Sequence, residues 1–108
     1  MDSLIVNIVN RRTTEDNSAV YVGRPTPLGN PFTAQQEGSR EVAIAKYKQW
    51  LNLQWTTLNR RVTDELKVLA KQLKRDGSIT LSCWCAPESC HAEIVGDALI
   101  ALINKDLV

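Results

Sequence analysis

The sequence has almost no net charge and no long apolar run. Thirteen Lys and Arg residues against twelve Asp and Glu residues leave a formal charge of +1, whereas nucleic-acid-binding domains often carry a strong basic excess. Six of the basic residues fall between Arg60 and Arg75, which predicts a solvated helix face rather than a specific DNA-reading surface. No apolar run approaches the ~20 residues of a membrane span. With 44% apolar residues, the chain is typical of a globular protein and not of a disordered one.

Cysteine is scarce and unevenly placed. The chain has three cysteines, and all lie between Cys83 and Cys90. An odd, crowded set of this kind is not the disulfide framework of a small secreted protein. The first residues, MDSLIVNIVN, have no basic segment before their apolar stretch and no small-residue cleavage site after it, so we expect no signal peptide. Both observations favour a reducing cytoplasm.

Three segments are expected to be β-strands within one domain, 1–108. Residues 3–10 and 19–23 are apolar and β-branched, and residues 78–85 alternate apolar with polar side chains. The first two segments are separated by a polar stretch that contains Asp16-Asn17-Ser18, a turn-type cluster. A hairpin between the first two strands is therefore expected.

Three amphipathic segments are expected to be helices. Ser39 can cap a helix from Arg40, Thr63 is a cap candidate for a second helix that ends at Gly77, and a third begins near Cys90. The order is then β-β-α-α-β-α, which predicts a small α/β domain with a short sheet packed by three helices. The apolar stripes at spacings of three and four are Ala43, Tyr47, Trp50, Leu51 and Leu58; Val62, Leu66, Leu69, Ala70 and Leu73; and Ile94, Val95, Ala98, Leu99, Leu102 and Ile103.

The loop of residues 23–32, GRPTPLGNPF, is unusually rich in proline and glycine. Its prolines exclude a helix and make the loop stiff. Gly23 and Gly29 would let the backbone approach a ligand, and the forked guanidinium of Arg24 suits a phosphate or carboxylate. We predict that these three residues bind the ligand and that Asn30, as a catalytic residue, orients it. The alternative is a rigid structural turn in which Asn30 bonds to nearby backbone.

A second unusual loop holds Cys83, Cys85, Cys90 and His91, the only histidine. Three Cys and one His are a familiar zinc set, but Cys-x-Cys with an adjacent Cys-His is not a familiar spacing. Alternatively, Cys90 and His91 open a helix, whose N-terminal partial charge lowers a thiol pKa and attracts anions. They would then be catalytic, with Cys90 a nucleophile or ligand contact and His91 an acid–base group.

Cysteines can also be ordinary small core residues, and this third interpretation is favoured for Cys83. Cys83 shares a strand face with Ile79 and Leu81. Trp84, on the opposite face, could stack on a nucleobase or a sugar, although a buried tryptophan is the commoner case. Together with Cys85, Trp84 is a candidate ligand-binding residue.

Several of these segments together resemble an uncharacterised family of small domains of unknown function found in phages and bacteria. The matching segments are Tyr21–Pro25, Gly29–Phe32, Tyr47 with Trp50-Leu51, Cys83–Pro87 and Cys90-His91. Ala92 departs from the family pattern, in which Gly is expected after Cys-His, and this narrows the approach to the helix N-terminus. The resemblance implies a phage-like context, and thus a host cytoplasm, but no established reaction.

Both unusual loops follow strands, so we expect them to face one cleft beyond the carboxyl ends of the sheet. Arg24 and the helix N-terminus both attract anions, which predicts a phosphate-bearing small molecule, such as a nucleotide, or a nucleic-acid segment as the partner. Whether the chain is an enzyme stays open, and no cofactor is indicated. The alternative is a non-enzymatic phage protein that binds a host protein, with structural loops that hold zinc through Cys83, Cys85, Cys90 and His91.

Overall fold

Three parallel strands form one sheet in the computed structural model, which describes residues 3–12, 19–83 and 91–108. β1 (Ile5–Asn10) and β2 (Val20–Tyr21) both pair with β3 (Ser78–Cys83), so the strand order is β1-β3-β2. Of the described strands, the last one in the sequence is therefore the central one. The predicted α/β fold and the order β-β-α-α-β-α are confirmed, with one additional short helix.

The expected hairpin between the first two strands is wrong. β1 and β2 lie on opposite sides of β3, and each runs parallel to it. The two ladders continue past the strand ends, where Arg11 N donates to the Cys83 carbonyl at 2.8 Å and Val22 N donates to the Ser82 carbonyl at 3.1 Å. The physical reason lies in β3, which is buried from Ile79 to Cys83 apart from the half-buried Thr80. A strand buried in this way belongs at the centre of a parallel sheet.

The helices are α1 (Ala34–Glu37), α2 (Arg40–Thr56), α3 (Arg60–Asp76) and α4 (His91–Asn104). Ser39 caps α2 as predicted, because its side chain accepts from Val42 N. Gly77 ends α3 in the left-handed region at φ 76°, where a residue without a Cβ is favoured. α1 has no counterpart among the predicted helices.

Two details of the predicted helices are wrong. Asn59, and not Thr63, occupies the N-cap position of α3, and Thr63 is buried inside the first turns of the helix at 4% exposure. Leu58 does not belong to the buried stripe of α2, since it lies in the connection to α3 with φ 56° and is 74% exposed. The basic side chains between Arg60 and Arg75 are exposed as expected.

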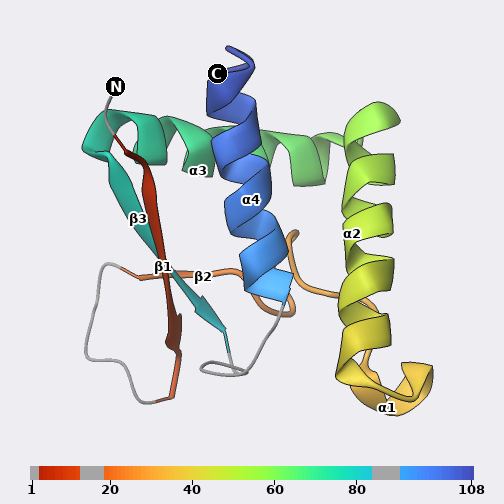
Figure 1. The fold of residues 1–108 in the computed structure, drawn as a ribbon. Helices are drawn as coiled ribbons and strands as arrows, with labels where there is room; N and C mark the ends of the chain where they lie inside the picture. Colours follow the sequence, from red (N-terminus) through yellow and green to blue (C-terminus); the bar gives the residue numbers. More distant parts are fainter. Residues whose placement is uncertain (1–2, 13–18, 84–90) are drawn as a thin grey trace.

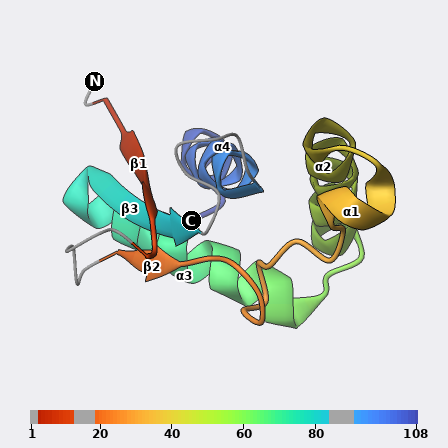
Figure 2. The ribbon, with the colours of Figure 1, turned by 90° about the horizontal axis from the view of Figure 1, so that it is seen from below.

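The sheet lies on one side of the molecule, α4 stands in the middle, and α2 stands on the far side (Figures 1 and 2). α3 runs across all three, from the end of α2 to the start of β3 (Figure 1). No helix within the described residues has the length and apolarity needed to cross a membrane. The core lies between these elements and consists of Val22, Leu28, Tyr47, Leu51, Val62, Leu66, Leu69, Ala70, Leu73, Ile79, Leu81, Cys83, Ala92, Val95, Leu99 and Leu102.

Candidate anion site at the carboxyl edge of the sheet

The carboxyl ends of the three strands meet at one edge of the sheet because all three strands are parallel. Arg11 and Arg12 follow β1, and residues 22–24 follow β2. The N-terminus of α4, at His91, lies near the same edge (Figure 1). Ligands of open α/β sheets bind at such an edge, where helix N-termini also collect.

Tyr21 contacts the side chain of one arginine and the backbone of another at this edge. The Arg11 guanidinium carbon lies 4.3 Å from the centre of the Tyr21 ring, a cation–π contact. The Tyr21 hydroxyl donates to the Arg24 carbonyl oxygen at 2.7 Å. Both arginines are exposed, and within the described residues no acidic side chain forms an ion pair with either. The edge therefore holds two positive charges without a neutralising carboxylate among these residues.

The loop that starts at Gly23 is held by its own short hydrogen bonds. Thr26 donates to the Gly23 carbonyl from its backbone N at 2.9 Å and from its hydroxyl at 2.6 Å, and Gly29 N donates to the Thr26 carbonyl at 2.9 Å. A Cβ at Gly29 would lie 2.8 Å from Arg24 N, and one at Gly23 would overlap the Tyr21 ring. The two glycines thus allow close packing inside the loop itself, and contact with a ligand at these glycines stays a prediction.

Asn30 and Tyr47 attach this loop to α2. The Asn30 amide donates to the Ala43 carbonyl at 3.3 Å and its side-chain oxygen accepts from Phe32 N at 2.9 Å. The Tyr47 hydroxyl, fully buried, donates to the Leu28 carbonyl at 2.6 Å. Asn30 thus bonds to backbone groups, as in the alternative of a rigid structural turn. Its catalytic role stays a prediction.

His91 connects the start of α4 to the residue before the loop. Its Nε2 lies 2.7 Å from the Val22 carbonyl oxygen, and because a carbonyl only accepts, Nε2 must carry the hydrogen. The ring is 7% exposed and meets the Tyr47 ring edge-on, with centroids 5.1 Å apart.

The surroundings of His91 lower its pKa below the ordinary value of 6.5. Burial of the ring is the largest cause, the bond to Val22 opposes it, and the charge of Arg24 lowers the pKa further. His91 is therefore neutral at pH 7, and the positive charge of this edge comes from arginine. The bond between His91 and Val22 places the start of α4 beside the residue that precedes the first loop.

Several predicted site residues lie outside the described residues. These are Trp84, Cys85 and Cys90, so their ligand-binding, catalytic and zinc-binding roles stay predictions. Cys83 is buried at 1% exposure, as expected for a core cysteine. Residues 3–12, 19–83 and 91–108 contain no group of three or more His, Cys, Asp or Glu residues placed to hold a metal ion.

The sequence reasoning missed Arg11, Arg12 and Tyr21 as candidate site residues. The sequence does contain a feature that points to the two arginines. A pair of basic residues directly after an apolar strand lies at the carboxyl edge of any parallel sheet. The expected hairpin concealed it, since in an antiparallel pair Arg11 and Arg24 would lie at opposite ends.

A family model matches residues 6–101, which include β1 from Val6 onward, the whole of β2 and β3, and α4 as far as Ala101. The chain belongs to the family described as Domain of unknown function (DUF4326). The DUF4326 match spans both loops and the arginines at the carboxyl edge. No curated protein and no solved structure matches the chain.

Proposed function

We propose that the carboxyl edge of the sheet binds a phosphate-bearing ligand, a nucleotide or a segment of nucleic acid. The observation that supports this is the pair of exposed arginines, Arg11 and Arg24. Tyr21 contacts the side chain of Arg11 and the backbone of Arg24, and neither arginine has an acidic partner among the described residues. Arginine presents a planar fork of donors that matches the oxygens of phosphate.

The neighbouring elements suit the same ligand. α4 is 14 residues long, and the dipole of a helix places partial positive charge at its N-terminus, near this edge. The His91–Val22 bond and the Asn30 bonds attach the loop that contains Arg24 to α4 and α2. In this proposal His91 is a positioning residue first, and a reaction at Cys90 and His91 is the further step that would make the chain an enzyme.

The test is a calorimetric titration of the purified chain with nucleoside mono-, di- and triphosphates, a short oligonucleotide and inorganic phosphate. Arg11→Ala and Arg24→Ala should each weaken binding by about 10- to 150-fold, the value of a charged hydrogen bond. Arg61→Ala is the matched control, because Arg61 is an exposed arginine on α3, and it should bind as the unaltered chain does.

Two outcomes would overturn the proposal. One is the absence of binding to every phosphate compound, and the other is binding that neither arginine substitution weakens. Zinc at one ion per chain in elemental analysis, with no response to phosphate compounds, would instead favour the alternative of a zinc-containing protein that binds a host protein.

A further inference from the structure

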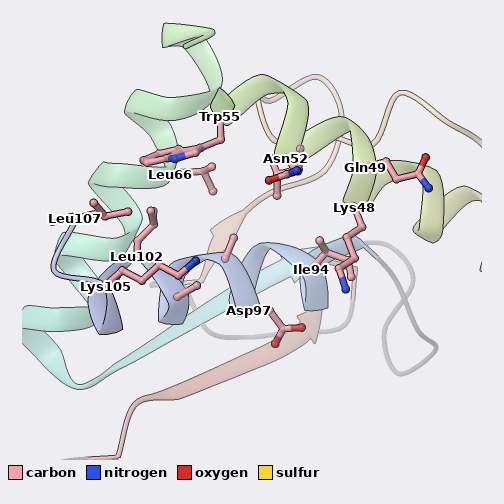
Figure 3. A pocket seen from close by; sticks show the side chains of 13 residues that line it. Lys48, Gln49, Asn52, Trp55, Leu66, Ile94, Asp97, Leu102, Lys105 and Leu107 are labelled. Atoms are coloured by element: carbon pink, nitrogen blue, oxygen red, sulfur yellow. The ribbon is translucent and has the colours of Figure 1, made fainter. Parts of the chain in front are cut away.

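A pocket of about 500 Å³ lies between α2 and α4 (Figure 3). α2 and α4 form its two walls, and Leu66 of α3 lies at its base. None of the residues at the carboxyl edge lines it, so it is separate from the site proposed above. The lining residues are Lys48, Gln49, Leu51, Asn52, Trp55, Leu66, Ile94, Asp97, Ala98, Ala101, Leu102, Lys105 and Leu107.

The base of this pocket is apolar, whereas its walls combine apolar with polar side chains. Leu51, Leu66 and Leu102 are core residues whose side chains reach the pocket from three helices. Ala101 on α4 is small and leaves the space open. The half-buried Trp55 borders the pocket, and the Lys67 ammonium lies 5.8 Å from the centre of its ring. An apolar body placed here would lose contact with water on several sides.

The charged side chains at the pocket are predominantly positive. Lys48 extends from α2 and Lys105 from α4, and both reach toward the space between the helices (Figure 3). Among the described residues that line the pocket, Asp97 is the single carboxylate, so these residues carry a net charge of +1. Within the described residues, neither lysine takes part in an ion pair. The pocket thus offers an apolar interior with two unneutralised ammonium groups at its opening.

We propose that this pocket binds an amphipathic organic monoanion, a ligand with an elongated apolar body and one carboxylate. The volume of the pocket lies within the range of small-molecule sites, about 300–1,000 Å³. A stable protein–protein interface buries about 1,000 Å² or more of surface and would have to extend well beyond the pocket. The two lysines select a negative head group, and Asp97 disfavours a second negative charge. This ligand class therefore differs from the phosphate compounds of the carboxyl edge.

Dodecanoate below its micelle-forming concentration is the probe, with dodecan-1-ol as the neutral analogue and dodecylammonium as the cationic one. Calorimetry should show one dodecanoate per chain, bound more tightly than either analogue. In Lys48→Met/Lys105→Met, dodecanoate should bind about tenfold more weakly, whereas dodecan-1-ol should bind as before. Lys71→Met, at an exposed lysine of α3 outside the pocket, is the matched control and should change neither affinity.

Ala101→Phe fills the pocket and should abolish binding of both dodecanoate and dodecan-1-ol, with an unchanged circular dichroism spectrum as the check on folding. The proposal is overturned if dodecanoate does not bind, if it still binds to folded Ala101→Phe, or if dodecylammonium binds more tightly. An acidic amphipathic peptide that binds where dodecanoate does not would assign the surface to a protein partner. None of these outcomes bears on the arginines of the carboxyl edge.

Discussion

Acidification should destabilise the folded chain through a single side chain, His91. The folded protein keeps this ring neutral, since burial and Arg24 hold its pKa below 6.5. The unfolded chain binds the proton at the ordinary pKa, so below that value it binds more protons than the folded chain does. The stability due to neutral His91 is thus complete above pH 6.5 and is lost as the pH falls toward the lower, folded-state pKa.

The magnitude has an upper bound because only one proton is involved. The free energy of unfolding can fall by at most about 1.4 kcal/mol per pH unit, and by about 1.4 kcal/mol in total between about pH 7.5 and pH 5.5. His91 is the only histidine in the chain, and the carboxylates titrate mainly below this range. Urea unfolding followed by circular dichroism at several pH values measures the loss directly.

His91→Gln is the matched variant, because the glutamine amide can donate to the Val22 carbonyl without titrating. We expect it to fold and to show a nearly flat dependence of stability on pH over the same range. The reasoning is refuted if the unaltered chain is equally stable at both ends of the range, or if His91→Gln loses stability as steeply as the unaltered chain.

Three further predictions concern the packing around the site. Tyr47→Phe leaves the buried Leu28 carbonyl without its donor and should lower the free energy of unfolding by about 1–3 kcal/mol; an unchanged urea midpoint would contradict this. Gly96→Ala places a Cβ 2.9 Å from Val6 Cγ1, so it should cost about 1–3 kcal/mol, and Val6→Ala in the same chain should recover part of the loss. Cys83, at 1% exposure, should be alkylated slowly in the native protein, and Cys83→Ala should cost about 1–2 kcal/mol; rapid alkylation under native conditions would disprove its burial.

The elements that could be predicted are those specified by local patterns. The apolar spacing of α3 and α4, the Ser39 cap and the Gly77 end all depend on residues within a few positions of one another. The partner of β1 could not be predicted in this way, because it lies 73 positions along the chain, where Ser78 pairs with Ile5. A short turn-like segment favours a hairpin locally, and the burial of β3 overrides it.

The same limit applies to the candidate site. An unusual loop marks Arg24 as a candidate in the sequence, whereas only the parallel pairing of β1 with β3 makes Arg11 a candidate. His91 was identified as a titratable group at a helix start, but its bond to Val22 crosses 69 positions of sequence. Composition indicates which side chains have useful chemistry. It does not indicate which of these side chains are already hydrogen-bonded to backbone groups elsewhere in the fold.

The central position of β3 also has a consequence for synthesis of the chain on the ribosome. β1 and β2 are made first, yet each finds its only described partner in a strand that ends at Cys83. During most of translation the two early strands therefore have exposed backbone groups and no ladder to join, while α2 and α3 can already form from local contacts. Unpaired strands of this kind are prone to aggregation. Nascent chains stalled before Ser78 should thus be helical, without a sheet and dependent on chaperones.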